Sequence, residues 1–198
     1  MIAEADRQLW AQSLRAIAPL SDEELAEVAG HLATLELERG AAFLRAGETP
    51  KVVGVLVSGV LREAFVLADG TERTRSFAIE GGLAGSLSDL LRGGPARTTV
   101  VAEESSRIVS VEWSVVRATI ARSAAWKTLL QLLTERLYLL KSDREWELLG
   151  LDAEERYQVF RTRYPGLEAR VTQRHVASYL GITPEHLSRI RARAHRSS

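Results

Sequence analysis

The chain has 198 residues, of which 45% are hydrophobic, and this size and composition suit a globular protein of one large domain or two modest ones. It contains no cysteine, which excludes disulfides and cysteine-ligated zinc or iron-sulfur sites and fits a reducing cytoplasm. The net charge is zero, yet residues 1–120 hold 12 Lys and Arg against 17 Asp and Glu, whereas residues 151–198 hold 9 against 5. A basic end on an acidic body favours phosphate binding at that end, with random drift of charge as the alternative.

The first thirty residues predict two short helices. Apolar residues recur at helical spacing between positions 9 and 17, and Ser21 followed by Glu24 forms a capping box for a second helix. The N-terminus carries acidic residues where a signal peptide carries basic ones, and no apolar stretch reaches the roughly 20 residues that span a bilayer. We therefore expect no membrane segment.

Short apolar runs separated by glycine fill residues 35–111 and predict strands. Residues 52–57 and 60–66 are rich in β-branched side chains, and Asp69 followed by Gly70 is a strong hairpin signal. Several short antiparallel strands at this spacing favour a small barrel or roll.

One long helix is predicted from about residue 124 to 149, because this stretch holds neither Gly nor Pro. Leucines and a tryptophan recur in it at alternating intervals of four and three, as in the seam of a coiled coil. The residues expected in this dimer interface are Trp126, Leu130, Leu133, Leu137 and Leu140. A second stripe, at positions 129, 132 and 139, would let the helix also pack on its own strand domain, and a core helix in a monomer is the alternative. Gly150 is expected to form a left-handed C-terminal cap.

A helix-turn-helix is predicted near the C-terminus, after a helix that Pro165 and Gly166 stop. Thr172 can cap its first helix, and Gly181 breaks that helix with a residue that tolerates positive φ. Thr183 is a plausible cap for the second helix, residues 183–194, with a proline at the first helical position.

The exposed side of this second helix is basic and could read a DNA groove. Arginine can pair with guanine through two hydrogen bonds, glutamate can accept from cytosine, and further arginines can contact phosphate. A plain structural corner is the alternative reading. The residues expected to contact DNA are Thr172, Arg174, Thr183, Glu185, His186, Ser188, Arg189, Arg191 and Arg193.

From about Leu14 to Arg193, the order of roll, long helix and helix-turn-helix resembles the Crp/Fnr family of bacterial transcription regulators. The family's recognition helix carries a Glu-x-x-Ser-Arg pattern, which is found here from Glu185 to Arg189, so the resemblance implies that these two residues touch bases. The chain departs from the family at Pro184, where an arginine is common. It also ends soon after this helix, where the family often continues into the strands of a wing.

Residues 85–101 resemble the phosphate-binding cassette of the family's nucleotide-binding members. The phosphate half is present in Arg97 and Thr98, but Ser86 stands where those members have a glutamate that accepts from the ribose. Affinity for a cyclic nucleotide would therefore fall, so cyclic AMP or GMP is disfavoured against another small anion at Arg97 or no ligand, and Arg97 as an ordinary surface arginine is the further alternative. The tentative pocket comprises Gly85, Ser86, Leu87, Arg97, Thr98, Leu140 and Lys141.

Taken together, these patterns predict an α+β protein with three parts. Residues 1–120 are expected to form a cyclic-nucleotide-binding-like antiparallel β-roll, residues 121–150 a dimerisation helix, and residues 151–198 a winged helix-turn-helix domain. The expected function is a cytoplasmic, homodimeric transcription regulator that binds a palindromic site on double-stranded DNA, with a second copy of the chain and RNA polymerase as partners and without a membrane. The alternative is a cyclic-nucleotide sensor that acts through a protein partner.

Catalysis is not expected. Four histidines and no cysteine leave little material for nucleophilic or metal chemistry, so no catalytic residue, no cofactor and no metal site are assigned. The neighbouring carboxylates Glu103 and Glu104 lie at a predicted turn and are expected to face water.

Overall fold

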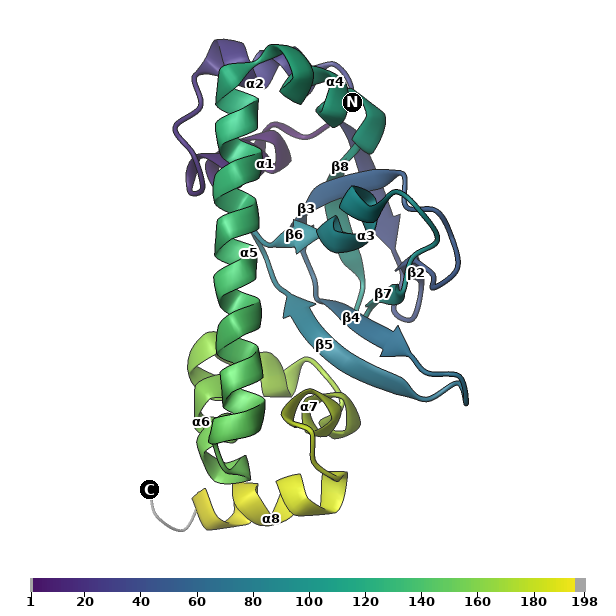
Figure 1. Ribbon diagram of the computed structural model, residues 1–198, viewed down its shortest axis with the longest axis vertical. Coiled ribbons are helices and arrows are strands. Elements are labelled where there is room, and N and C mark those ends of the chain that lie inside the picture. The colour runs from purple at the N-terminus through teal and green to yellow at the C-terminus, as the bar shows by residue number, and fades with distance from the viewer. Residues whose placement is uncertain (1, 195–198) are drawn as a thin grey trace.

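The computed structural model describes residues 2–194, so the last four residues of the expected C-terminal domain lie outside it. The molecule is elongated, and one helix, α5, runs along its length beside the strands (Figure 1). The helices are α1 (Glu4–Arg15), α2 (Asp22–Ala29), α3 (Leu87–Arg92), α4 (Trp113–Arg122), α5 (Ala124–Gly150), α6 (Ala153–Arg163), η1 (Leu167–Ala169), α7 (Gln173–Leu180) and α8 (Pro184–Ala194). The strands are β1 (Ala33–Leu37), β2 (Ala42–Leu44), β3 (Val52–Ser58), β4 (Leu61–Val66), β5 (Glu72–Ala78), β6 (Leu83–Ala84), β7 (Thr98–Ala102) and β8 (Ser106–Glu112).

The predicted roll is present as two four-stranded antiparallel sheets. Their strand orders are β1-β8-β3-β6 and β2-β7-β4-β5, so β4 and β5 are the one pair of neighbours that is consecutive in the described sequence, and the other pairs join distant parts of it. The predicted hairpin joins β4 to β5, with Gly70 at φ 79° and the carboxylate of Asp69 accepting from the backbone N–H of Thr71 at 2.8 Å. In the β2-containing sheet, β5 is at the edge, where it meets the C-terminal helices.

Side-chain caps begin several of the helices, and the cap predicted at Ser21 is one of them. The capping box of Ser21 and Glu24 is formed at α2, and Asp152 with Glu155 forms a second one at α6. The expected left-handed cap at Gly150 is wrong: this residue is the last of α5 and has no positive φ, while Leu151 leaves the helix in an extended conformation. The chain therefore turns from α5 into α6 without using glycine's conformational freedom.

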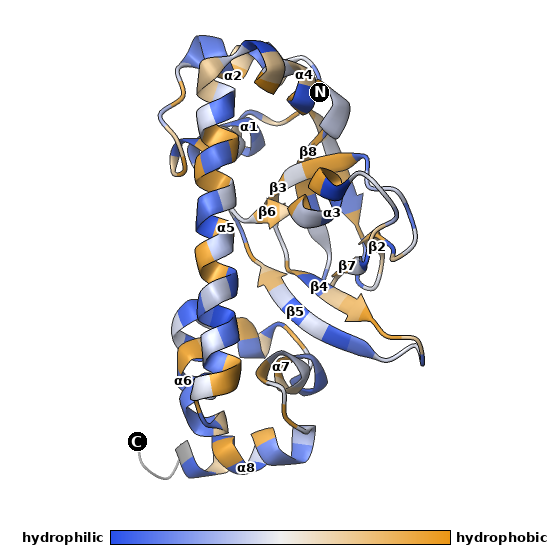
Figure 2. Cartoon of the chain, viewed as in Figure 1, coloured by the Kyte–Doolittle hydropathy of each residue, from blue (hydrophilic) through white to orange (hydrophobic). Residues whose placement is uncertain are grey.

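The predicted coiled-coil seam of α5 faces the chain's own core for most of its length. Trp126 is 3% exposed and its indole N–H donates to the carbonyl of Glu24 at 3.0 Å, so the expectation that it contacts a second chain is wrong. Leu130, Leu133 and Leu137 are partly buried against the same core of α1, α2 and the β8-containing sheet. Apolar residues recur along the whole of α5 (Figure 2), because the helix carries two apolar stripes.

The lower half of α5 exposes a different apolar seam. Leu139, Trp146 and Leu149 are 60%, 62% and 82% exposed, and Tyr138 beside them is 70% exposed. Leu139, Ser142, Trp146 and Leu149 follow one another at intervals of three, four and three, which is the spacing of contact residues in paired helices. The upper part of α5 adds an open apolar groove, lined by Ile120, Lys127, Leu130, Gln131, Thr134, Glu135, Tyr138 and Leu139.

Helices α6, α7 and α8 form the end of the molecule opposite to α1 and α2 (Figure 1). Glu147 of α5, 3% exposed, holds α6 by accepting from Arg163 at 2.5 Å, and it also accepts from Arg144 of its own helix at 3.0 Å. The position after α8, where the resemblance implies a wing, lies outside the described residues. None of the helices described is long and apolar enough to cross a membrane.

Candidate nucleic-acid interface and ligand pocket

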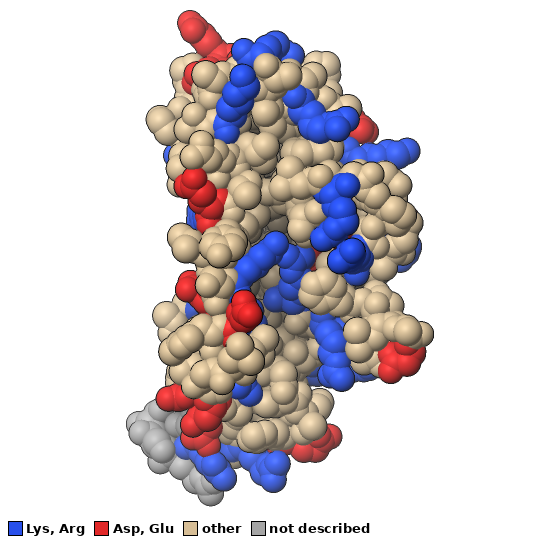
Figure 3. Space-filling model, in the orientation of Figure 1, with Lys and Arg blue, Asp and Glu red and all other residues tan. Residues whose placement is uncertain are grey.

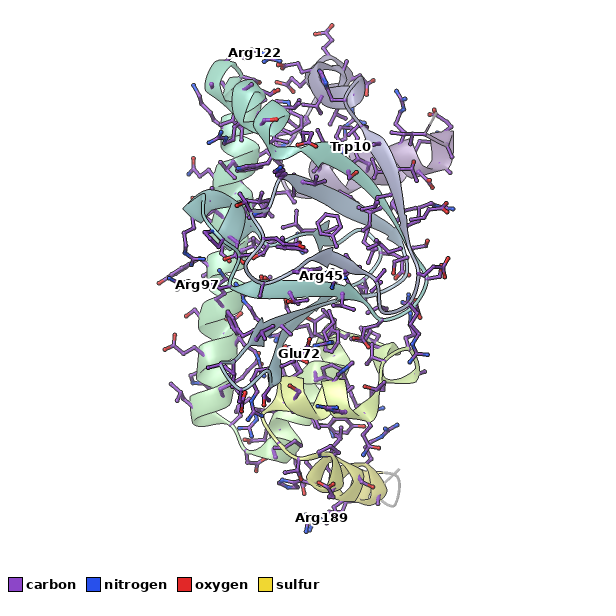
Figure 4. All side chains as sticks on the ribbon, turned by 90° about the vertical axis from the view of Figure 1, so that its right-hand side faces the viewer. Trp10, Arg45, Glu72, Arg97, Arg122 and Arg189 are labelled. Atoms are coloured by element: carbon purple, nitrogen blue, oxygen red, sulfur yellow. The ribbon has the colours of Figure 1, made fainter. Side chains whose placement is uncertain are left out.

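Helix α8 lies across the far end of the molecule with one side packed and the other open. Leu187 and Ile190 are 0% and 3% exposed and hold the helix against α6 and α7, whereas Glu185, Ser188 and Arg189 are exposed. Figure 4 shows Arg189 at the outermost tip of the protein, pointing away from the roll. This surface can therefore approach a large partner without rearrangement of the core.

The turn between α7 and α8 has the geometry that the sequence predicts. Gly181 adopts φ 71° and ψ 31°, a left-handed conformation that side chains disfavour. The hydroxyl of Thr172 accepts from the backbone N–H of His175 at 3.3 Å, and that of Thr183 accepts from the N–H of His186 at 3.2 Å. Both threonines thus work as helix caps.

Glu185 and Arg189 are one helical turn apart on the exposed side of α8, which is the relation that lets side chains interact along a helix. The pKa of the Glu185 carboxyl is lowered, mainly by a hydrogen bond from its own backbone N–H. A bond from the Thr183 hydroxyl and the charge of Arg189 lower it further. The carboxylate is therefore ionised at neutral pH and can act only as an acceptor.

The other basic residues expected to contact DNA fall into two groups. Arg174 is exposed at the start of α7. Arg191 and Arg193 instead turn back toward the helical domain: Nε of Arg191 lies 3.6 Å from Glu168, and Nη1 of Arg193 lies 2.6 Å from Glu154. These two arginines would have to exchange those carboxylates for phosphate in order to contact DNA.

Helix α7 is docked on the roll by side chains that the sequence did not single out. Ser178 Oγ accepts from the backbone N–H of Thr74 on the edge strand β5 at 2.9 Å. Phe77 of the same strand packs edge-on against Tyr164 and Phe160, with ring centroids 5.8 and 6.3 Å apart. The C-terminal helices therefore cover an edge that would otherwise expose unpaired backbone groups.

Charged groups complete this contact. Nδ1 of His175 lies 2.7 Å from Oε2 of Glu103, whose Oε1 accepts from Nε of Arg62 at 2.6 Å. The expectation that Glu103 faces water is wrong, since its side chain is 4% exposed. Its neighbour Glu104 is one-third exposed and accepts from Arg170, which also binds Glu80.

The expected ligand pocket contains an anion that belongs to the chain itself. Asp89, 1% exposed in α3, accepts from the hydroxyl of Thr98 at 2.8 Å and from the backbone N–H of Arg97 at 3.3 Å. Its other oxygen accepts from Arg92 at 2.5 Å. Although burial alone would raise the pKa of Asp89, bonds from Thr98, Ser86 and Arg97 and the charge of Arg92 lower it, so a carboxylate occupies this site.

The remaining expected pocket residues are spread out. Ser86 is 2% exposed, 3.3 Å from the hydroxyl of Ser88, and Leu87 is part of the hydrophobic core. The side chain of Arg97 has no hydrogen bond or ion pair within residues 2–194, and Figure 4 shows it at the edge of the roll. Leu140 is 41% exposed and Lys141 follows it on α5.

Four residues that shape this pocket were not predicted from the sequence: Asp89, Arg92, Arg75 and Glu63. Nη1 of Arg75 donates to Glu63 at 2.6 Å and to Ser88 at 3.4 Å. The three-residue spacing of Asp89 and Arg92 in the cassette helix was the one signal available for a local ion pair. The pairing of Arg75 with Glu63 depends on the register between β4 and β5, which the sequence does not show.

Comparison with known proteins accounts for this architecture. Residues 34–123 match the family model of the cyclic nucleotide-binding domain. The match covers the strands of the roll, helix α3 with its cassette, and α4, whereas α5 to α8 lie beyond it.

Solved structures with this domain extend the likeness to the C-terminal helices. FixK2 from Bradyrhizobium japonicum has a TM-score of 0.73 at 21% identity, over 84% of this chain and 85% of its own. CLP of Xanthomonas campestris, a c-di-GMP-responsive global regulator, has a TM-score of 0.69 at 13% identity, over 89% and 93%. The catabolite activator protein of Thermus thermophilus has a TM-score of 0.57 at 23% identity, over 93% and 87%.

These likenesses confirm that the chain shares its fold with Crp/Fnr regulators. A search of curated proteins found no match to the sequence. At these identities the likeness concerns the fold around the cyclic nucleotide-binding domain, so the ligand and the DNA contacts have to be argued from this chain's own residues.

Proposed function

We propose that this protein is a homodimeric, DNA-binding transcription regulator in which α7, the turn at Gly181 and α8 form a helix-turn-helix. The observation that carries the proposal is the open side of α8, where Glu185 and Arg189 project from the tip of the molecule while Leu187 and Ile190 anchor the helix. Such a helix fits the major groove of duplex DNA, with the first helix of the pair behind it.

The two exposed side chains provide complementary chemistry for reading bases. The guanidinium of Arg189 can donate two hydrogen bonds to one guanine, and the ionised Glu185 can accept from cytosine. Arg174 supplies a positive charge for phosphate at the start of α7. Arg191 and Arg193 supply further charge if DNA phosphates replace Glu168 and Glu154 as their partners.

Dimerisation in this proposal uses the exposed seam of α5. Leu139, Trp146 and Leu149 expose a large apolar surface to water, and such patches mark sites of protein–protein contact. Their spacing along the helix suits packing against α5 of a second copy of the chain. A two-fold axis along α5 would place two copies of α8 at the same end of the assembly, about 34 Å apart on successive major grooves.

Cyclic nucleotides are not part of the proposed mechanism. The donors that would hold a cyclic phosphate, Thr98 and the amide of Arg97, already bind the carboxylate of Asp89. A phosphate entering the same position would meet a like charge at hydrogen-bonding distance, which is strongly unfavourable in a buried site.

Selection from a random duplex library tests the proposal. We expect the purified protein to enrich a palindromic site with half-sites one helical turn apart, and to lose affinity steeply between about 50 and 200 mM salt. Binding to all duplexes alike, or to none, would contradict it.

A further inference from the structure

A cluster of cations lies where α5 passes the roll. Arg75 comes from the edge strand β5, Arg92 from the end of α3, and Lys141 from α5. Figure 3 shows blue side chains converging there from both sides of a hollow between α5 and the roll, at the middle of the long axis. Three separate elements therefore direct positive charge toward one hollow.

Each arginine of the cluster has a carboxylate partner that takes only part of its donors. Arg75 uses Nη1 for Glu63, and Arg92 uses Nη1 for Asp89. Within residues 2–194, the other N–H groups of both guanidinium groups make no hydrogen bond, and Lys141 has neither a hydrogen bond nor an ion pair. The cluster thus keeps several charged donors that are available to a ligand.

Two arginines and two carboxylates act on Lys141. Partial burial lowers the pKa of its ammonium group, and the charges of Arg75 and Arg92 lower it further, against the opposing effect of Glu63 and Asp89. The three cations and two carboxylates therefore leave the cluster with an excess of one positive charge, which a bound anion would neutralise.

The carboxylate of Asp89 decides where such an anion can sit. It occupies Thr98 and the backbone of Arg97 on the inner side of the cassette, so an incoming anion is excluded from those donors.

We propose that Arg75, Arg92 and Lys141 form a binding site for a small oxyanion, a compound with a phosphate or carboxylate group, which bridges the roll and α5. Guanidinium groups bind such groups through paired hydrogen bonds, and the ammonium adds a compact charge from the opposite wall. This site goes beyond DNA binding and is separate from the cassette donors held by Asp89.

Thermal melting of the full chain tests the site at constant ionic strength, with pyrophosphate in one series and malonate in the other. We expect the melting temperature of the wild type to rise and saturate in at least one series, which also identifies the phosphate or the carboxylate group as the preferred one. The variant Lys141→Met should lose this rise.

Two control variants make the result specific. Lys127→Met removes an exposed lysine from another part of the same helix, and Arg189→Ala removes the exposed arginine of α8; both should keep the saturable rise. A wild type without a saturable response to either anion would overturn the proposal, and so would a Lys141→Met variant that responds like the wild type. If the response requires Lys141 while no DNA sequence is enriched, the anion site stands and the regulator proposal falls.

Discussion

His175 on α7 and Glu103 on the roll are joined by a 2.7 Å contact between Nδ1 and Oε2, although they lie 72 residues apart in the sequence. Arg62 holds the other oxygen of the same carboxylate, and both Arg62 and Glu103 are almost fully buried. The first helix of the proposed DNA-binding unit is therefore attached to the roll through a buried charge, and the position of α8 depends on this attachment.

Removal of the Glu103 charge should destabilise the protein strongly. In Glu103→Gln the buried Arg62 keeps only Glu72, whose side chain is 39% exposed, as a charged partner. Breaking a buried pair costs up to about 3–5 kcal/mol, and Glu72 should offset part of this loss. Urea denaturation measures the loss. The matched control is Glu104→Gln, since Glu104 is one-third exposed and its pair with Arg170 should contribute at most about 1 kcal/mol. Equal losses for the two variants would show that Glu103 has no special role.

Stability should also fall in acid. His175 and Arg62 lower the pKa of the Glu103 carboxyl in the folded state, against desolvation, which acts in the opposite direction. The pKa of the Asp89 carboxyl is also lowered, because its hydrogen bonds from Thr98, Ser86 and Arg97 outweigh the effect of burial. A carboxyl whose pKa is lowered by folding stabilises the fold above its unfolded value, near pH 4, and this contribution is lost as the pH falls through the folded pKa.

Urea midpoints measured from pH 7 to pH 3 follow this loss. The decline below about pH 4.5 should be shallower in Glu103→Gln, because the variant has no carboxyl to protonate at that position. A wild type whose midpoint does not change over this range would contradict the assignment.

The proposed dimer should depend on the lower half of α5. We expect Leu139→Glu to convert a dimer into a monomer, because the charge would be buried without a partner in the interface. Light scattering coupled to size-exclusion chromatography gives the mass. Leu67→Glu is the control, since Leu67 is 44% exposed on the β4-β5 hairpin, away from this seam. A monomeric wild type, or a Leu139→Glu variant that remains dimeric, would refute the seam.

Cyclic AMP and cyclic GMP should not bind measurably. Asp89 occupies the donors that a cyclic phosphate needs, and Ser86 is turned toward Ser88 instead of an open pocket. Calorimetric titration of the full chain is the direct measurement. A saturable heat with either nucleotide would mean that Asp89 yields its place to a ligand.

The sequence predicted those parts of the structure that depend on near neighbours. The capping box of Ser21 and Glu24 and the turn at Gly181 involve residues within a few positions of one another, and both are present. The hairpin at Asp69 and Gly70 is present for the same reason. Their stability rests on hydrogen bonds within a single turn, which residue type and spacing are enough to specify.

Contacts between distant elements could not be predicted in the same way. Two apolar stripes of α5 have nearly the same period, so spacing alone does not show which of them faces the roll, and Trp126 proved to be inside the chain's own core. Glu103 looked like a surface residue because its partners, Arg62 and His175, come from other elements. The role of Asp89 could not be predicted, because it depends on a bond from Thr98, in the strand that follows the helix of Asp89.

If α8 reads DNA through Arg189, replacement of this side chain must weaken binding to the selected duplex, which fluorescence anisotropy measures. We expect Arg189→Ala to lose about 1–3 kcal/mol of binding free energy and to tolerate substitution at one base pair of each half-site. Arg45→Ala is the control, since Arg45 is an exposed arginine on the roll, far from Arg189 (Figure 4). The control should bind like the wild type. Equal affinity and equal base preference for all three proteins would contradict the account.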